Sequence, residues 1–402
     1  MKQKSKILLL ENIHPDAGMI FKKSGHRPKA FKGGLSEQEL AKFLKDVSVL
    51  GIRSKTRVTG EILKQARNLE AVGIFAIGAD QIDLSTASDC GVAVFNAPYS
   101  NTRSVVELVL GEMIMLLRKT FDKSAKLHLG VWEKSAEGSF EARGKKLGII
   151  GYGNIGSQLS VLAEALGMEV FYYDIAEKLA LGNAKRCGSM EELLKKSNIV
   201  TLHVDGRKEN KNLISEKEFK LMKAGAYLLN LSRGFVVDIP ALVKYLKNGK
   251  IRGAAVDVFP KEPKNNNEKF KIQLQNLPNV ILTPHVGGST REAQKNIANY
   301  MATKLLNYLE SGDTFLSLNF PNVQLPKVVD AHRFISIHKN VPGMLAKINS
   351  ILARYKINIE GQYLKTNEKI GYVITDVNKK YSKEVLKELA NIPNTIKFRV
   401  LY

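Results

Sequence analysis

The chain has few of the features of secreted and membrane proteins. Only two of its 402 residues are cysteines, Cys90 and Cys187, too few for a disulfide framework. No apolar stretch reaches the length needed to cross a bilayer. The apolar run Ile7–Leu10 is too short for the core of a signal peptide, and Glu11 follows it at once. We therefore expect a reducing, cytoplasmic location.

A basic tail and an arginine-rich block are also missing, although the formal net charge is +22. Lysine occurs in every region, so a lysine-rich surface is favoured over nucleic-acid binding, which remains an alternative. A positive field would also draw anionic ligands to the protein. Histidine and cysteine show no clustered metal-ligand spacing, so no metal is expected. Four histidines belong to no constellation: His14, His26, His128 and His332.

The most informative stretch is a glycine-rich turn, Gly151-Tyr152-Gly153-Asn154-Ile155-Gly156. It follows the apolar run Leu147–Ile150 and opens a helical pattern that continues to Leu166. A lone G-x-G-x-x-G is usually an ordinary turn, but this strand–turn–helix context indicates a dinucleotide site. The first glycine permits the tight turn, the second lets the backbone approach a pyrophosphate, and the third lets the helix pack on its strand. The helix N-terminus offers free N–H groups to the phosphates.

The acidic residue that such a site requires is Asp174, at the end of the next apolar run, Val170–Tyr173. Its carboxylate can accept hydrogen bonds from a ribose diol and would repel a 2′-phosphate. The sequence therefore predicts NAD, rather than NADP, as the cofactor.

Strand-like and helix-like segments alternate over the first hundred residues. The predicted strands are Lys6–Glu11, Val47–Arg53, Leu69–Phe75 and Val92–Asn96. Ser36-Glu37-Gln38-Glu39 is a capping box that opens a helix to about Lys45. This alternation predicts a parallel sheet with helices on both faces.

A long helix from Asn101 or Thr102 to about Lys119 is apolar nearly all round, so we expect it to be buried between domains or subunits. The alternation then resumes from Lys146. Its later predicted strands are Asn198–Val204, Ala226–Leu231, Ala254–Val258 and Val280–Thr283. A helix from Thr290 to about Leu309 is expected to cross back onto the first unit.

The C-terminal region has a separate, smaller pattern of strands and helices, which follows a predicted linker at Pro321–Pro326. Its predicted elements are strand Arg333–His338, helix Pro342–Arg354, strands Ile357–Leu364 and Tyr372–Val377, helix Lys383–Leu389 and strand Ile396–Leu401. This βαββαβ order is ferredoxin-like.

Three polar residues lie in distinctive settings after the nucleotide motif. Arg233 and His285 each come just past the end of a predicted strand, and Glu262 lies in the segment Val256–Pro263. The carboxyl ends of strands are where an open α/β sheet places its ligand groups. Histidine can move a proton in either direction near neutrality, a carboxylate can orient it, and arginine can bind a carboxylate with two hydrogen bonds.

With these residues the chain resembles the D-2-hydroxyacid dehydrogenases, and most closely the D-3-phosphoglycerate dehydrogenases of the serine-regulated bacterial type. The resemblance runs from Gly51-Ile52-Arg53-Ser54 to the C-terminal βαββαβ unit. It implies an α/β chain with three domains: a flavodoxin-like substrate domain (1–100 and 288–325), a Rossmann NAD-binding domain (101–287) and an ACT domain (326–402).

The family's catalytic Arg, Glu and His fall on Arg233, Glu262 and His285. Asp257 matches the residue that contacts the nicotinamide amide, and His203 a cofactor-side position, although Asp205-Gly206 follows where the family usually has proline. The implied cofactor residues are Gly151, Tyr152, Gly153, Asn154, Ile155, Gly156, Asp174, His203, Ser232, Asp257, Gly287 and Gly288. The implied substrate residues are Arg53, Ser54 and Asn101, with Lys55 nearby.

The C-terminal unit resembles an ACT domain, a module that senses amino acids. The family's L-serine positions fall on His338, Asn340 and Asn358. Amide side chains donate and accept hydrogen bonds, which suits a zwitterion. Asp330-Ala331 stands where relatives often carry a Gly-Gly pair, which implies a stiffer hinge.

The resemblance implies NAD-dependent oxidation of 3-phospho-D-glycerate to 3-phosphohydroxypyruvate, the first step of L-serine biosynthesis, in a homotetramer with the Trp132 region as a candidate contact. Two alternatives stay open: another D-2-hydroxyacid dehydrogenase with an ACT domain, and a non-catalytic dinucleotide-sensing protein. The intact set of Arg233, Glu262 and His285 speaks against the second.

Overall fold

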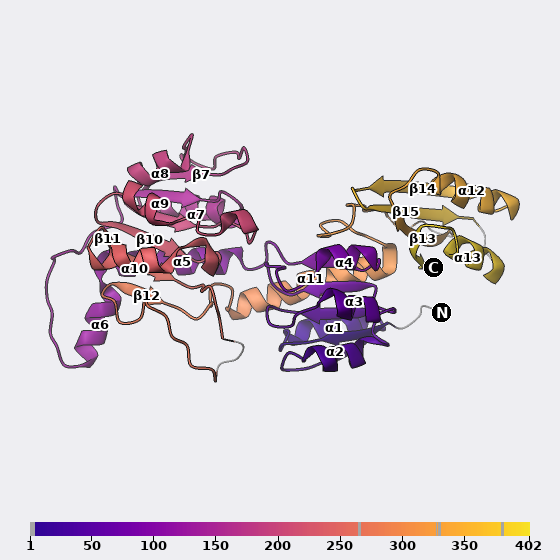
Figure 1. The fold of residues 1–402 in the computed structure, drawn as a ribbon, viewed down its shortest axis with the longest axis horizontal. Helices are drawn as coiled ribbons and strands as arrows, with labels where there is room; N and C mark the ends of the chain where they lie inside the picture. The colour runs from indigo at the N-terminus through magenta and orange to yellow at the C-terminus, as the bar shows by residue number, and fades with distance from the viewer. Residues whose placement is uncertain (1–4, 264–266, 327, 329–330, 379–381) are drawn as a thin grey trace. The chain divides into compact units, whose positions relative to one another are not determined.

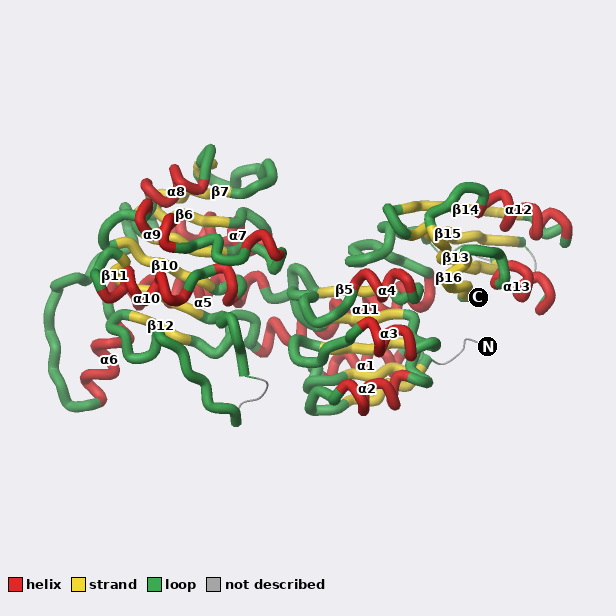
Figure 2. Tube along the Cα trace, in the orientation of Figure 1, coloured by secondary structure: helices red, strands yellow, loops and turns green. Residues whose placement is uncertain are grey.

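The computed structural model describes residues 5–263, 267–326, 328, 331–378 and 382–402. The chain forms two compact units, the first from Met1–Pro98 and Lys295–Tyr402 and the second from Tyr99–Gln294. Figure 1 gives the elements in chain order, and Figure 2 shows the strands of the three sheets in yellow. In the described part of the chain, no helix is long and apolar enough to cross a membrane.

The first unit contains a five-stranded parallel sheet in the order β2-β1-β3-β4-β5. Its strands are β1 Lys6–Leu9, β2 Arg27–Ala30, β3 Val49–Ile52, β4 Ala71–Ile74 and β5 Ala93–Asn96. Its helices are α1 Pro15–Lys23, α2 Glu37–Leu44, α3 Gly60–Gln65 and α4 Leu84–Asp89. The order 2-1-3-4-5 is the flavodoxin-like one, which confirms the predicted fold class.

The long helix α11, Arg291–Ser311, packs on this sheet, as the sequence predicted. Met301 and Leu305 lie in one buried cluster with Ile7 and Leu9 of β1. A Cβ at Gly73 of β4 would approach the Leu305 side chain to 2.6 Å, so the glycine lets the helix lie close to the strand.

The C-terminal sheet has the antiparallel order β14-β15-β13-β16. Its elements are β13 His332–Lys339, α12 Met344–Arg354, β14 Ile359–Thr366, β15 Ile370–Val377, α13 Lys383–Ala390 and β16 Thr395–Val400. The two helices cover one face, where Phe334 packs with Ile348 and Leu389. The other face places Ile335 and Tyr372 in the same buried cluster as α11. The module therefore shares a core with the first unit, which the predicted linker had not suggested.

The second unit is built on a seven-stranded parallel sheet in the order β12-β11-β10-β9-β6-β7-β8. Its strands are β6 Lys146–Ile150, β7 Glu169–Tyr173, β8 Lys185–Arg186, β9 Ile199–Leu202, β10 Ala226–Asn230, β11 Ile251–Val256 and β12 Val280–Leu282. Its α-helices are α5 Thr102–Arg118, α6 Thr120–His128, α7 Asn154–Ala165, α8 Met190–Lys196, α9 Glu216–Leu221 and α10 Ile239–Lys247. The order reverses between β6 and β9, as expected for a Rossmann sheet.

Successive residues of a strand point to opposite faces of the sheet, and here the residues on both faces are apolar. Helices therefore cover both faces. Ile149 of β6 packs in the cluster that contains α5 and α7, whereas Ile150 packs in the cluster that contains α8, α9 and α10. Helix α5 presents Val106, Val109 and Met113 to the sheet. Ile114 of this helix is 40% exposed in the single chain, and burial of its outer face between subunits stays a prediction.

Candidate active site

The glycine-rich turn joins β6 to α7 as the motif predicted. Gly151 has φ +94°, and a Cβ there would meet the His203 carbonyl oxygen at 2.6 Å, so only glycine fits. A Cβ at Gly156 would lie 2.3 Å from the Gly151 oxygen, so this glycine permits the close packing of helix and turn. Gly153 is the N-cap of α7 and would place a Cβ in open space. The turn and the start of α7 thus have the shape that a pyrophosphate requires.

Asp174 follows β7 and lies beside this turn. One carboxylate oxygen accepts the Tyr152 backbone N–H at 2.8 Å, and the other accepts the N–H of Ala176 at 2.9 Å. A carboxylate has about four acceptor positions, so two hydrogen bonds leave capacity for a ribose diol. The residues present therefore fit the adenosine half of a dinucleotide.

His203 follows β9, next to Gly151. Its Nε2 lies 2.9 Å from the Thr201 hydroxyl, and its Nδ1 is buried with no hydrogen-bond partner among the described residues. Burial lowers the pKa of His203 to about 3, so the ring is neutral. A buried nitrogen without a partner needs a physical reason, and a ligand group at the position predicted to face the cofactor would supply one.

His285 and Glu262 form the pair that the sequence predicted. The Nδ1 atom of His285 lies 2.8 Å from one Glu262 oxygen and 3.0 Å from the other. The Phe259 backbone N–H also bonds to Glu262 at 3.2 Å. His285 has φ +54° in the turn after β12, and both side chains remain partly exposed. The turn thus presents an oriented imidazole to solvent.

The electrostatics of this pair favour the imidazolium. The hydrogen bond that His285 donates to Glu262 raises the pKa of His285, although burial acts in the opposite direction. Burial acts to raise the pKa of Glu262, but the bond to His285 and its charge lower it overall. A carboxylate that fixes Nδ1–H leaves Nε2 as the nitrogen that can exchange a proton with a substrate.

Arg233 follows β10 and contributes a cation near the same pair. Its guanidinium donates to the Ser232 carbonyl at 2.8 Å, and its charge opposes the raised pKa of His285. Ser232 is buried and bonds through its hydroxyl to Asn230 at 2.9 Å. The three residues assigned to catalysis therefore lie at neighbouring strand ends of one sheet.

Asp257 follows β11 and anchors the turn that carries His285. It is 1% exposed and accepts the Thr283 hydroxyl at 2.7 Å. It also accepts the backbone N–H groups of Val286 at 2.8 Å and Gly287 at 2.9 Å. Asp257 thus holds the turn on both sides of His285, through Thr283 before it and through Val286 and Gly287 after it.

Asn101 lies at the start of α5, beside the end of this turn. A Cβ at Gly288 would lie 2.4 Å from the Asn101 amide nitrogen, and the Asn101 Oδ1 atom is buried without a partner among the described residues. The side chain therefore borders the site within the second unit.

The other residues that the resemblance assigns to the substrate belong to the first unit, in the loop after β3. Arg53 is half-buried, and this burial lowers its pKa. Ser54 and Lys55 are exposed. Glu11, which is 6% exposed, accepts the backbone N–H groups of Lys55 at 2.9 Å and Thr56 at 2.8 Å. Sequence reasoning had placed Glu11 in a strand and missed this role.

The three effector candidates are not brought together within one chain. His338 is the penultimate residue of β13 and pairs with Gly371, the second residue of β15, whereas Asn358 precedes Ile359, which pairs with Val377 at the other end of β15. Six residues of strand separate these ends, roughly 20 Å. Asn340 stays near His338 and donates to the Asn367 carbonyl at 2.8 Å.

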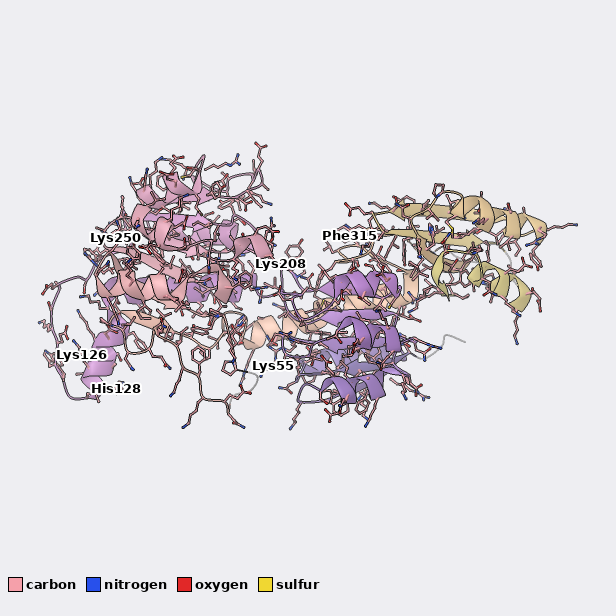
Figure 3. The ribbon with its side chains drawn as sticks, viewed as in Figure 1. Lys55, Lys126, His128, Lys208, Lys250 and Phe315 are labelled. Carbon is pink, nitrogen blue, oxygen red and sulfur yellow. The ribbon has the colours of Figure 1, made fainter. Side chains whose placement is uncertain are left out.

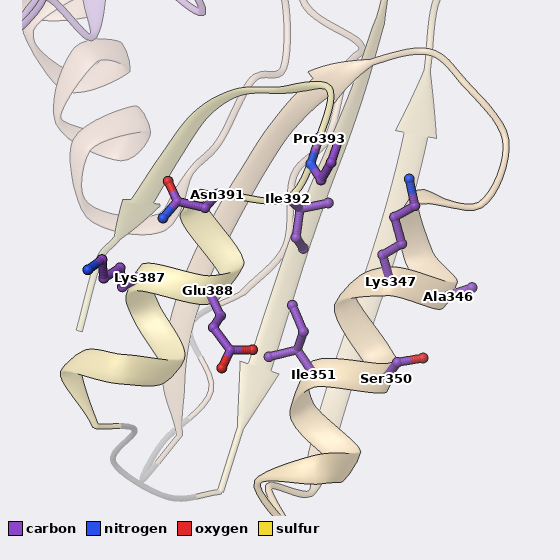
Figure 4. Close-up of a pocket in the computed structure, with 9 residues that line it drawn as sticks. All are labelled: Ala346, Lys347, Ser350, Ile351, Lys387, Glu388, Asn391, Ile392 and Pro393. Carbon is purple, nitrogen blue, oxygen red and sulfur yellow. The ribbon is translucent and has the colours of Figure 1, made fainter.

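His338 is buried, and burial lowers its pKa. Its Nδ1 lies 2.7 Å from the Lys339 carbonyl, and its Nε2 is buried without a partner among the described residues. An open groove between α12 and α13 includes Lys347, Ile351, Glu388 and Ile392 but none of the three effector candidates (Figure 4). Asp330 lies outside the described residues, and Ala331 is buried.

Comparison with known proteins agrees with this geometry. Residues 110–287 match the family model of the D-isomer specific 2-hydroxyacid dehydrogenase, NAD binding domain, and residues 334–397 match that of the AHAS small subunit-like ACT domain. A D-3-phosphoglycerate dehydrogenase of Dictyostelium discoideum is 50% identical over 401 residues, which cover 100% of this chain and 98% of that protein. One of Escherichia coli K12 is 47% identical over 404 residues, with the same coverage. The chain belongs to the D-3-phosphoglycerate dehydrogenase family.

A solved D-lactate dehydrogenase from Aquifex aeolicus, complexed with NAD and lactic acid, is similar in fold. It has a TM-score of 0.65 and 26% sequence identity, and the match covers 75% of this chain and 95% of that one. As a D-3-phosphoglycerate dehydrogenase family member with a matched NAD-binding domain, the chain is an NAD-dependent oxidoreductase of the 2-hydroxyacid type.

Sequence reasoning missed two residues of this family member's site. Thr283 and Glu112 complete the polar cluster around Asp257, and the Thr283 hydroxyl lies 3.2 Å from Glu112. A carboxyl inside the otherwise apolar stretch Leu108–Leu117 was the available signal.

Proposed function

We propose that the protein oxidises 3-phospho-D-glycerate to 3-phosphohydroxypyruvate with NAD, as the first step of L-serine biosynthesis. The 2.8 Å contact between His285 and Glu262, close to Arg233, is the observation that carries the proposal. This arrangement suits proton transfer at a hydroxyl carbon beside a carboxylate. The family of close relatives supports the choice of substrate.

Each catalytic residue has a distinct task in this reaction. NAD, if bound by the glycine-rich turn and Asp174, would supply the acceptor for the hydride that leaves C2 of the substrate. His285 removes the proton of the C2 hydroxyl through Nε2, and Glu262 holds the ring through Nδ1 and stabilises the imidazolium that results. Arg233 offers a planar fork to the substrate carboxylate and polarises the C2 oxygen.

Arg53 and Ser54, with Asn101, are the proposed contacts to the remaining charged groups of the substrate. A half-buried guanidinium binds an anion more strongly than an exposed one because water screens it less. Lysines such as Lys55, Lys126, Lys208 and Lys250 lie on different elements of both units (Figure 3), so the net charge of +22 is spread out and attracts anions in general.

L-Serine is the proposed effector, bound between two ACT domains of different chains. The separation of His338 and Asn358 along β15 supports such a site, because each ligand would take one group from each chain. We propose a homotetramer in the cytoplasm, with one interface near Trp132. Trp132 is 78% exposed and Leu129 is 83% exposed, and these apolar side chains follow α6.

The test is NADH formation by the purified protein with 3-phospho-D-glycerate, D-glycerate or D-lactate, with and without L-serine. We expect turnover to require the phosphorylated acid and to fall when L-serine is added. Turnover of D-lactate or D-glycerate that equals or exceeds that of the phosphorylated acid would assign the protein to another D-2-hydroxyacid dehydrogenase activity. NADH binding with no turnover of any acid would indicate a dinucleotide-sensing protein.

A further inference from the structure

A buried carboxyl lies behind the active site and has no part in the chemistry above. Glu112 of α5 is 0% exposed, and its Oε2 has no hydrogen-bond partner within the part of the chain that the structure describes. Its Oε1 lies 3.2 Å from the Thr283 hydroxyl. Unpartnered polar atoms are rare in protein interiors, so this one needs a physical reason.

The number of hydrogens available for hydrogen bonding indicates whether Glu112 is protonated. The Thr283 hydroxyl lies 2.7 Å from Asp257 and 3.2 Å from Glu112, but it has one hydrogen to donate. Asp257 lies closer to Thr283 than Glu112 does and also accepts two backbone N–H groups, so it is the acceptor that receives the Thr283 hydrogen. The Thr283 oxygen can then only accept a bond from Glu112, which requires a protonated Glu112.

Electrostatics agrees with this assignment. Burial and the nearby charge of Asp257 raise the pKa of Glu112 to about 7, although a hydrogen bond from Thr283 would act to lower it. Four charged groups on the elements around α5 have partners of their own. Asp122 accepts the Asn279 backbone N–H, Glu164 accepts the Asn183 backbone N–H, Arg252 lies over the Phe140 ring, and His285 bonds to Glu262. No cation that could neutralise an ionised Glu112 contacts it among the described residues.

We propose that Glu112 is a positioning residue of the nicotinamide site, the protonated end of a Glu112–Thr283–Asp257 chain that holds the turn carrying His285, and that loss of its proton weakens NADH binding. An ionised Glu112 would compete with Asp257 for the single hydrogen of Thr283 and would repel it. The hydrogen bonds that the backbone N–H groups of Val286 and Gly287 donate to Asp257 would weaken as a result. The inference rests on the proposed place of Asp257 beside the nicotinamide.

The experiment is an NADH titration of the full-length protein, followed by nicotinamide fluorescence without substrate from pH 6 to pH 9. In the unmodified protein we expect affinity to fall about tenfold as the pH rises through 7, the effect of a one-unit pKa shift on binding. Glu112→Gln keeps a donor for Thr283 and cannot ionise, so its affinity should stay at the low-pH value throughout. Glu107→Gln, an exposed carboxylate on the same helix, is the matched control and should follow the unmodified protein.

A Glu112→Gln profile that follows the unmodified protein would overturn the inference. Thr283→Val gives a second test because it removes the hydroxyl that joins Glu112 to Asp257 but keeps the size of the side chain. At pH 6 it should bind NADH several-fold more weakly than the unmodified protein, and unchanged affinity would also overturn the inference. The NADH titration needs no substrate, so its result does not depend on which acid the protein oxidises. Failure to oxidise 3-phosphoglycerate would refute the proposed function without deciding the role of Glu112.

Discussion

At the scale of single residues, the bond between His285 Nδ1 and Glu262 assigns proton transfer to the other ring nitrogen. His285→Ala removes this transfer but leaves the glycine-rich turn and Asp174 in place. We expect turnover to fall by about 10²–10⁴-fold with NADH affinity retained. The measurements are steady-state turnover and NADH titration, with the exposed His128→Ala as the control. A variant that keeps most of its turnover would exclude His285 from the mechanism.

Glu262→Gln changes the charge beside His285 with little change in shape. The hydrogen bond to the Glu262 carboxylate raises the pKa of His285, so replacement of that carboxylate by a neutral amide should lower the pKa. Reduction of the keto acid needs the imidazolium, so its rate should decline at lower pH than in the unmodified enzyme. A pH–rate profile for reduction measures this, and Glu209→Gln on the exposed segment Lys208–Asn210 is the control. An unchanged or upward-shifted profile contradicts the assigned role.

Asp174 should determine the choice between NAD and NADP. Its carboxylate accepts two backbone N–H groups and keeps capacity for a ribose diol, and its charge repels a 2′-phosphate. The unmodified enzyme should strongly prefer NAD, and Asp174→Ala should weaken NAD binding and narrow the preference. Comparison of kcat/KM for the two cofactors decides the matter, and equal use of both by the unmodified enzyme would defeat the hypothesis.

At the scale of elements, apolar patterning located the buried strands well and the exposed ones poorly. Strands β1, β3, β4 and β5 lie in the core, so their side chains are mostly apolar. This apolar pattern is what made the four strands predictable. Strand β2 was missed because it is a mostly exposed edge strand with the sequence Arg-Pro-Lys-Ala. The glycine-rich turn and the His285–Glu262 pair were predictable from local motifs. The Glu112–Thr283–Asp257 chain was not, since it joins residues from three distant segments.

The pairing of β13 with β15 depends on a buried ion pair. Arg333, which is 0% exposed, bonds to both oxygens of Asp376 at 2.7 Å and also to the carbonyls of Ser311 and Pro326. Asp376→Ala leaves a buried guanidinium without its counterion and should lower the free energy of unfolding by about 3–5 kcal/mol. Chemical denaturation measures this. Glu388→Ala breaks the exposed pair with Arg354 and should have only a small effect. Equal effects of the two changes would show that the buried pair is not structural.

At the scale of the whole molecule, the ACT module is attached to the first unit by more than a linker. Tyr372 of β15 donates to the Gly312 carbonyl at 2.8 Å, and Arg399 of β16 forms an ion pair with Glu70 at 2.6 Å. The sequence could not reveal these contacts because they join segments that are far apart in the chain. Tyr, Arg and Glu side chains are also common on solvent-exposed surfaces, so their presence gave no sign of an internal contact. A chain ended near Pro326 would expose this shared core, so point substitutions are the sounder test of regulation.

Inhibition by L-serine should therefore be tested with paired variants of the intact chain. Asn340 lies near His338 at one end of the sheet, and Asn358 lies at the other end. The proposed site between two chains takes Asn340 from one chain and Asn358 from the other, so loss of either residue should weaken it. Asn340→Ala and Asn358→Ala should each weaken inhibition strongly and leave uninhibited turnover unchanged, whereas Asn391→Ala, in the separate α12–α13 groove, should change neither. Allosteric coupling is typically ~1–3 kcal/mol, so inhibition of the unmodified enzyme should saturate at a finite level. If both variants are inhibited like the unmodified enzyme, L-serine acts elsewhere, and competition with the substrate would place it at the active site.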